Sequence, residues 1–331
     1  MKDRRTVGIL GMLLVVAMVM AGVVGCGGGE GADSEQVTIG ITQIVEHPAL
    51  DAARQGFIDA MTEGGYVEGE NVIYDFNNAQ NDKSNALTIA QKFANDKVDL
   101  IFAIATPTAQ AASQATADIP ILITAVTDPV AAGLVESMEA PGTNVTGTTD
   151  MNPIAEQLEL IKAFVPGAKK VGVIYNAGEV NSEVQVKIAK EVAGDIGLEI
   201  VEASVATSAD VNQAAGSLAG RVDAIYVPTD NTVVSALETV LQVAEEHKIP
   251  VIAGEGDSVE RGALATVGID YYELGRQTAE MAIRVLKGED PATMPIEKQK
   301  NMQLYVNKSA AKAMGVEIPE DILNEADQVF E

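Results

Sequence analysis

The stretch Leu100-Ile101-Phe102-Ala103-Ile104 is an uninterrupted apolar run, and it is followed at once by Ala105-Thr106-Pro107. A run that is apolar throughout, rather than alternating with polar residues, indicates a strand covered on both faces of a sheet. Proline suits the first turn of a helix, because the N–H that it lacks would be unpaired there in any case. The stretch therefore predicts a buried strand, a short polar turn and a helix.

The same pattern recurs in both directions along the chain. Further strands are predicted at 37–41, 72–76 and 121–125, and a second series at 171–175, 198–201, 224–227 and 250–253. In the first series, helices are predicted to open at Pro48, around 85–94, near Pro107 and at Pro129. Strands that alternate with helices in this way favour parallel sheets built from right-handed crossovers. The predicted fold class is α/β, with two doubly wound lobes.

The first 25 residues have the layout of a secretory signal peptide. Lys2, Arg4 and Arg5 precede an uncharged run at 7–24, which leads into Cys26, the only cysteine of the chain. Val23-Val24-Gly25-Cys26 resembles the lipobox of bacterial lipoproteins, which implies cleavage before Cys26 and lipid attachment to its thiol. A membrane-spanning helix is the alternative, since the apolar run is near the minimum spanning length.

Residues 26–36 are rich in glycine and acidic, which predicts a flexible linker. If the signal peptide is removed at Cys26, the folded part lies outside the cytoplasm, anchored to the cell membrane by the lipid alone. About 295 residues remain from Val37 onward, a length that suits two lobes better than one small core.

Composition argues against several classes of function. The formal net charge is −26, so nucleic acid and anionic lipid headgroups are not expected partners. The sequence contains no nucleophile elbow, Walker loop or zinc-ligand spacing, and neither His47 nor His247 has a nearby metal-ligand companion of suitable spacing. We therefore expect no enzyme, no cofactor and no metal.

Ligands of doubly wound sheets bind beyond the carboxyl ends of the strands, so the loops there should carry the function. After the first strand, Pro48 predicts a helix whose first amides, at Ala49 and Leu50, favour an anionic group such as a carboxylate. Glu46 and His47 precede this helix, either as ligand contacts or as a local capping pair.

Two threonines stand at the ends of neighbouring strands in the same predicted lobe. Thr106 and Thr127 could each be a plain helix cap, the commonest role for threonine at such a position. Together, in one sheet, they favour a site in which both hydroxyls meet the same carboxylate.

The second lobe presents the loops Tyr175-Asn176, 228–231 and 254–256. Asp230 ends an otherwise apolar strand, where its carboxylate could pair with a cationic group or cap the next helix. Glu255 could pair with the same cation or interact across the hinge. The chain has no tryptophan, so aromatic stacking on a ligand would come from Tyr175, Tyr271 or Tyr272.

Six stretches in this order resemble the substrate-binding proteins of a branch of ABC importers. They are Gln43 to Asp51, Ala105-Thr106-Pro107, Thr127-Asp128-Pro129, Thr146 to Asp150, Pro228 to Asn231 and Val267 to Gly275. The resemblance covers essentially all of Val37 to Val329 and implies the type I periplasmic-binding-protein fold. Several members of the branch are associated with tryptophan or other aromatic amino acids. The candidate ligand-binding residues are then Gln43, Glu46, His47, Ala49, Leu50, Thr106, Thr127, Asp128, Thr148, Tyr175, Asn176, Asp230, Asn231, Glu255 and Asp270.

The fold implied by the resemblance also sets the expected domain organisation. Lobe 1 should comprise 37–147 and 255–301, and lobe 2 should comprise 148–254 and 302–331. Three chain crossings are expected, near Gly147, Gly254 and Asn301, and glycine at two of them would allow the backbone changes of a hinge.

The function expected from these features is that of a monomeric, non-catalytic receptor. It would capture a small solute, an amino acid being favoured, by closure of two lobes, and would deliver it to an ABC permease driven by an ATPase. Lobe 1 would meet the carboxylate and Asp230 the ammonium group, because a buried unpaired charge costs several kcal/mol. Two alternatives stay open: a ligand-sensing partner of a chemoreceptor or sensor kinase, and an importer receptor for a sugar or other neutral solute. Among ligands, a branched aliphatic amino acid and a purine-like solute also stay open.

Overall fold

The computed structural model describes residues 36–299 and 301–331, and Val37–Glu331 forms one compact unit. The predicted signal peptide, Cys26 and all of the predicted linker except Gln36 lie outside the described residues. Among the helices of the described part, none is both long and apolar enough to cross a bilayer.

Two sheets organise this unit. The first has the order β11-β5-β4-β3-β1-β2 and is parallel throughout. Its strands are β1 (Val37–Gln43), β2 (Val72–Asn78), β3 (Leu100–Ile104), β4 (Ile121–Thr124), β5 (Val145–Thr149) and β11 (Glu297–Lys298). We call this sheet and its helices lobe 1.

The second sheet has the order β13-β12-β10-β9-β8-β6-β7, and only the β10–β12 pair is antiparallel. Its strands are β6 (Lys170–Asn176), β7 (Glu199–Val205), β8 (Ala224–Val227), β9 (Val251–Ala253), β10 (Ala265–Gly268), β12 (Gln303–Asn307) and β13 (Gln328–Phe330). This sheet and its helices form lobe 2. Each lobe has its own hydrophobic core.

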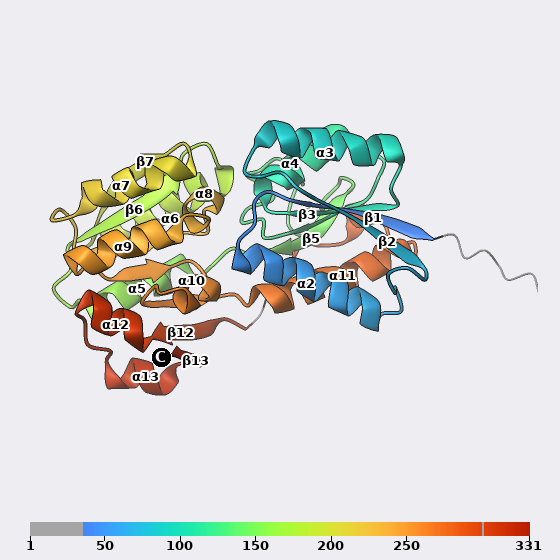
Figure 1. Ribbon diagram of the computed structural model, residues 1–331. Coiled ribbons are helices and arrows are strands. Elements are labelled where there is room, and N and C mark those ends of the chain that lie inside the picture. Colours follow the sequence, from blue (N-terminus) through green and yellow to red (C-terminus); the bar gives the residue numbers. More distant parts are fainter. Residues whose placement is uncertain (1–35, 300) are drawn as a thin grey trace, which may run out of the picture. The chain divides into compact units, whose positions relative to one another are not determined.

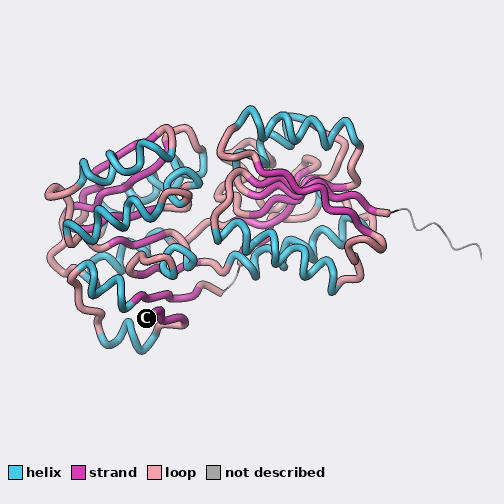
Figure 2. The backbone as a smooth tube through the Cα atoms, viewed as in Figure 1, coloured by secondary structure: helices cyan, strands magenta, loops and turns pink. Residues whose placement is uncertain are grey.

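Helices cover both faces of each sheet, as Figure 2 shows by the strands that run between layers of helix. In lobe 1, α2 (Pro48–Glu63) and α11 (Tyr271–Leu286) lie side by side on one face, and α3 (Lys83–Asp96) and α4 (Thr106–Ala115) lie on the other (Figure 1). The helices of lobe 2 are α5 (Ile154–Phe164), α6 (Val180–Asp195), α7 (Val211–Leu218), α8 (Asn231–Val234), α9 (Leu237–His247), α10 (Gly256–Glu260), α12 (Lys308–Met314) and α13 (Glu320–Glu325). Short 3-10 turns occur at Ser208–Asp210 and Pro291–Thr293.

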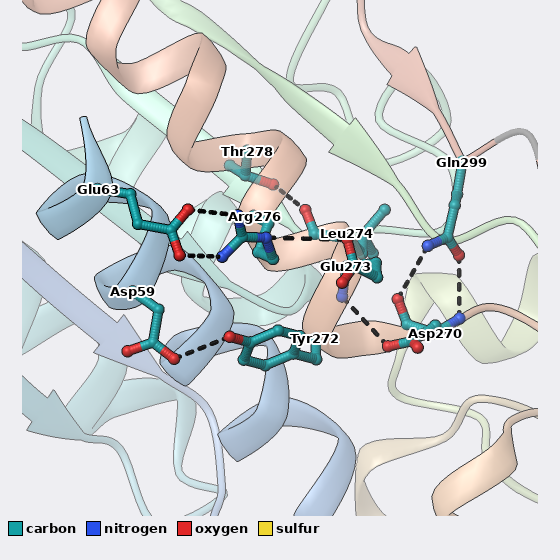
Figure 3. A network of polar contacts seen from close by, with 9 residues as sticks. All are labelled: Asp59, Glu63, Asp270, Tyr272, Glu273, Leu274, Arg276, Thr278 and Gln299. Atoms are coloured by element: carbon teal, nitrogen blue, oxygen red, sulfur yellow. Dashed lines mark hydrogen bonds and ion pairs between the residues drawn. The ribbon is translucent and has the colours of Figure 1, made fainter.

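Two glycines bring α2 and α11 unusually close. A Cβ placed on Gly56 would lie 2.0 Å from the carbonyl oxygen of Tyr272, and one on Gly275 would lie 1.9 Å from that of Ala53. Beside this crossing, Tyr272 donates a hydrogen bond to Asp59, and Arg276 forms a two-pronged ion pair with Glu63 (Figure 3). The contacts fix the position of α2, whose first turn borders the site described below.

Three connections join the lobes, and one of them differs from the sequence prediction. The chain crosses at 150–153, at 269–270 and at 299–302. The stretch 255–268 was expected in lobe 1, but β10 pairs with β9 and the side chains of Val259 and Leu264 pack in the core of lobe 2. The return to lobe 1 therefore comes after Gly268 and not at Gly254.

The two remaining boundaries lie closer to the expected positions. Gly147 and Thr148 belong to β5 in lobe 1, so the first crossing comes a few residues later than predicted. Asn301 lies within the third connection.

The helix predicted at Pro129 is also absent, since 129–133 forms turns. The carboxylate of Asp128 accepts hydrogen bonds from the amides of Val130 and Ala131, which starts a single helical turn. Gly133 then adopts a left-handed backbone with φ of 73°, and this ends the turn.

Candidate functional site

The carboxyl ends of strands from both sheets surround a small cavity of about 20 Å³. Every lining residue follows a strand or lies in the first turns of the helix after it, as the rule for doubly wound sheets predicts. The lining residues are His47, Ala49, Leu50, Ala125, Asp150, Asn181, Thr229, Asp230, Asn231, Val234, Glu255 and Tyr271.

The first turn of α2 forms part of the lobe 1 wall. Pro48 occupies the first helical position, so the amides of Ala49 and Leu50 are the first that the helix can offer to a ligand. His47 precedes them with 8 % of its surface exposed, and its Nδ1 has no hydrogen-bond partner among the described residues. Burial, together with the positive charge of Arg261, lowers the pKa of His47 to about 3, so the imidazole is neutral at physiological pH.

Two alanines at the ends of lobe 1 strands have strained backbones. Ala105, after β3, has φ of 83°, and Ala125, after β4, has φ of 55°. Residues other than glycine seldom adopt such angles, and they cluster at functional sites when they do. Ala125 lines the cavity, and Ala105 precedes Thr106, whose buried hydroxyl has no hydrogen-bond partner in the part of the chain that the structure describes.

A buried carboxylate stands at the first connection between the lobes. Asp150 accepts a hydrogen bond from the hydroxyl of Thr127 at 2.9 Å and one from the hydroxyl of Tyr271 at 2.6 Å. Burial raises the pKa of the Asp150 carboxyl, and the two hydroxyl donors work in the opposite direction. The Asp150 carboxylate thus links the first connection between the lobes to the start of α11, the helix that follows the second connection.

On the lobe 2 wall, Asp230 is fully buried and caps α8. Its Oδ1 accepts from the amide of Val233 at 2.8 Å, and its Oδ2 accepts from the amide of Asn176 and the hydroxyl of Ser182, both at 2.6 Å. Burial and the negative charge of Glu179 raise the pKa of Asp230 to about 7. The structure shows the capping role that the sequence allowed, and the carboxylate also faces the cavity, where its pairing with a cationic group stays a prediction.

Three polar atoms around the cavity are buried without a partner in the described structure. They are Nδ1 of His47, Oδ1 of Asn181 and Oγ1 of Thr229. An unpaired buried polar atom costs about 1–3 kcal/mol, so native structures rarely keep several in one place without a use. These atoms come from both lobes, which is the arrangement needed to bind a polar solute between them.

Of the candidate ligand-binding residues, six line the cavity: His47, Ala49, Leu50, Asp230, Asn231 and Glu255. Glu255 also caps α10 through the amide of Ser258, and burial raises the pKa of its carboxyl. Thr127 does not line the cavity, but its hydroxyl donates a hydrogen bond to Asp150, which does.

The other candidates on lobe 1 are occupied elsewhere. Glu46 is exposed, and Asp128 accepts only from its own turn. The side-chain amide of Gln43 donates to Asp51 and accepts from Arg54.

Thr148 also points away from the cavity. Its hydroxyl bonds the hydroxyls of Thr124 and Thr278 inside lobe 1. Thr106 is buried, but it does not line the cavity.

Three candidates remain, and they lie on lobe 2 or at its border. Tyr175 donates to Glu202 at the surface, Asn176 binds Thr232, and Asp270 caps α11. None of these three residues lines the cavity, so their predicted contact with a ligand has no support from its geometry.

Sequence reasoning had not proposed Ala125, Asp150, Asn181, Thr229 or Val234 as ligand-binding residues, whereas Tyr271, which lines the cavity, was proposed for aromatic stacking on the ligand. Asp150 and Thr229 stand inside stretches that suggested the family, so their position after a strand was a usable signal. Asn181 lies in the first turn of α6, and nothing in its sequence neighbourhood separates it from an ordinary helix residue.

Comparison with known proteins identifies the family. The family of ABC transporter substrate binding proteins matches residues 38–330. The chain belongs to this family. The match confirms the family inferred from the loop sequences. Its members are substrate-binding proteins and not enzymes.

The chain is similar to a tyrosine-binding protein of Clostridioides difficile, with 47 % identity over 319 residues and 92 % of each chain covered. A domain from Streptococcus pneumoniae, solved in complex with L-Trp, is 38 % identical with a TM-score of 0.86 over 89 % of this chain and 100 % of that one. A substrate-binding protein with adhesive properties from Clostridium difficile, solved in a ligand-free, open form, is 53 % identical with a TM-score of 0.68 over 89 % and 99 %.

A distant sugar-binding structure shares the fold alone. The glucose-galactose binding protein of Geobacillus stearothermophilus is 17 % identical with a TM-score of 0.58, over 82 % of this chain and 97 % of that one. The fold is that of the type I periplasmic binding proteins, as the resemblance implied.

Proposed function

We propose that this protein is the lipid-anchored, extracytoplasmic receptor of an ABC importer, and that it captures an aromatic amino acid between its two lobes. The observation that carries the proposal is the set of unpaired polar atoms from both lobes around one cavity. The similarity to a tyrosine-binding protein and to a domain in complex with L-Trp supports the ligand class.

The charges around the cavity suit a zwitterion. Asp150, Asp230 and Glu255 contribute three buried carboxyl groups, whereas the lining residues include no lysine or arginine. An ammonium group can pair with these carboxyl groups, and a carboxylate can meet the first amides of α2 beside His47. A neutral sugar would leave the carboxyl groups of this lining without a cation.

The apolar part of the lining suits a side chain with little polarity. Leu50, Val234 and the ring of Tyr271 border the cavity together with two alanines. Burial of an aromatic ring on such a surface adds hydrophobic free energy to the polar contacts.

A cavity of about 20 Å³ has room for roughly one water molecule, which is far less than an amino acid needs. Binding therefore requires the lobes to move apart along the three connections. The comparisons support such a motion: the open, ligand-free relative superposes less well than the L-Trp complex, although its sequence is more similar.

Calorimetric titration of the Val37–Glu331 unit with tyrosine, tryptophan, phenylalanine, leucine and glucose tests the ligand class. A micromolar dissociation constant, equivalent to about 8 kcal/mol, is expected for at least one aromatic amino acid. Small-angle scattering should show compaction at saturation. Binding of glucose with no response to any amino acid would overturn the proposal.

The Asp230→Asn variant tests the ammonium contact. It keeps the shape and removes the charge, so loss of a charge-assisted bond should weaken amino-acid binding about ten- to hundredfold. Asp257→Asn is a matched control, because burial also raises the pKa of Asp257 to about 7 but this residue does not line the cavity. Equal dissociation constants for the two variants would move the ammonium site away from Asp230.

Transport and sensing use the same capture step, so binding data alone do not separate them. Uptake of the labelled amino acid by cells with and without the gene does so, because a sensor would leave uptake unchanged.

A further inference from the structure

A second set of contacts between the lobes lies outside the cavity. A groove of about 680 Å³ is lined by Ile44, Asn81–Ser84 and Pro107 from lobe 1 and by Asn176–Glu179 and Ser204–Ala206 from lobe 2. Two hydrogen bonds join the lobes here. Asn81 Nδ2 donates to Thr232 Oγ1 at 3.1 Å, and Lys83 Nζ donates to the carbonyl oxygen of Gly178 at 2.6 Å.

The lobe 1 side of these contacts has two features that are locally unfavourable in free energy. Gln80 and Asn81 both have left-handed backbones, with φ of 55° and 58°. The amide of Asn81 is held by the carbonyl oxygen of Ile44 at 2.6 Å, which fixes the turn on the strand exit. Lys83 occupies the first position of α3, where a positive charge is unfavourable to the helix dipole. The left-handed turn is held by contacts within lobe 1, whereas the contact that the Lys83 ammonium group makes in the described structure is with lobe 2.

On the lobe 2 side, the hydroxyl oxygen of Thr232 is free to accept hydrogen bonds. The hydroxyl of Thr232 donates its only hydrogen to Oε1 of Glu179 at 2.9 Å, so its lone pairs are left for amide donors. Asn176 Nδ2 takes one of them at 2.9 Å, and Asn81 takes the other from across the groove. Because the acceptor is polarised by a buried carboxylate, the bond from Asn81 is stronger than one to an isolated hydroxyl.

None of the contacting residues, Asn81, Lys83, Gly178 and Thr232, lines the cavity. We propose that Asn81 and Lys83 form a latch that sets ligand affinity without touching the ligand, by stabilising the arrangement in which the lobes meet. The inference rests on the proposed capture function. It adds residues that determine affinity but leave the preference among ligands unchanged.

Asn81→Gly tests the latch, because glycine removes the side chain while it tolerates the left-handed backbone. The matched control is Gln80→Gly, which changes the adjacent left-handed and exposed residue. Asn81→Gly should raise the dissociation constant for tyrosine or tryptophan about two- to tenfold, the range of one net hydrogen bond. The increase should come mainly from faster dissociation, since the latch must open before the ligand can leave.

Lys83→Met removes the second contact and retains the apolar stem of the side chain. Its control is Lys97→Met, at the exposed C-terminal end of the same helix. Each latch variant should change its dissociation constants for tyrosine and for tryptophan by the same factor. A changed preference between the two ligands would overturn the proposal, because it would place the latch residues in contact with the ligand.

A readout without ligand separates this proposal from the capture function. The Val37–Glu331 unit contains no cysteine, so Gln91→Cys on α3 and Gln213→Cys on α7 can carry a donor and acceptor dye. The fraction of molecules with the short inter-dye distance should fall in Asn81→Gly and not in Gln80→Gly. Equal fractions in the two variants would overturn the latch, whether or not an aromatic amino acid binds.

Discussion

Replacement of Gly275 by alanine should destabilise lobe 1 severely. The new Cβ would lie 1.9 Å from the backbone carbonyl oxygen of Ala53, whereas ordinary contacts of this kind begin at 3.4 Å. The two helices would have to separate by about 1.5 Å at their crossing, and a backbone atom cannot rotate away as a side chain can. Overpacking of a core costs about 1–3 kcal/mol and sometimes more, so we expect at least about 3 kcal/mol here.

The matched control is Gly194→Ala in α6, since a Cβ at Gly194 would meet nothing within 4 Å. Alanine is favoured over glycine inside a helix by about 1 kcal/mol, so this variant should be neutral or more stable. The assay is urea unfolding followed by circular dichroism, with thermal unfolding as a second measure. Gly275→Ala should melt roughly 6 °C or more below wild type. Equal stability of the two variants would refute the packing argument for α2 and α11.

Three further predictions concern the site and the anchor. The pKa of Asp230 is raised to about 7, above its unfolded value near 4, so its protonation stabilises the fold at low pH and this contribution is lost as the pH rises toward 7. The free energy of unfolding of wild type minus that of Asp230→Asn should therefore fall from pH 5 to pH 8 in urea titrations, and a rise over this range would contradict the burial argument. Tyr271→Phe removes a donor from the buried Asp150 carboxyl and should cost about 1–3 kcal/mol by the same titration, whereas an unchanged midpoint would show that water replaces the hydroxyl. Cys26→Ser should abolish incorporation of labelled palmitate, and labelling equal to wild type would exclude the proposed anchor.

The sequence was most informative about local structure. The run 100–104 forms a strand with the predicted bounds, and α2 begins at Pro48 as expected. It was less informative about which lobe a segment joins. A strand–helix–strand unit such as 251–268 has the same pattern in either lobe, and only its non-local pairing with β8 and β12 assigns it to lobe 2.

For the site, position after a strand was a better guide than residue type. His47 and Asp230 were found in this way, and Asp150 could have been. Thr148 was proposed from the family resemblance and Tyr175 as an aromatic residue at a strand end, but strand register turns the first into the lobe 1 core and the second toward Glu202. Register depends on the whole sheet, so a single stretch of sequence does not reveal it.

The discontinuous construction of lobe 1 has a consequence for the order in which the chain can assemble. The apolar face of α2, including Ala53 and Phe57, is buried partly by α11, which begins only at Tyr271. Lobe 2, by contrast, draws five of its seven strands from the continuous stretch 170–268. During synthesis α2 and the first strands of lobe 1 appear early, but α11, which covers the same face of their sheet, appears only late in the chain. We therefore expect lobe 1 to fold later than the continuous part of lobe 2, and the uncovered face of α2 to be the surface that a folding chaperone would have to protect.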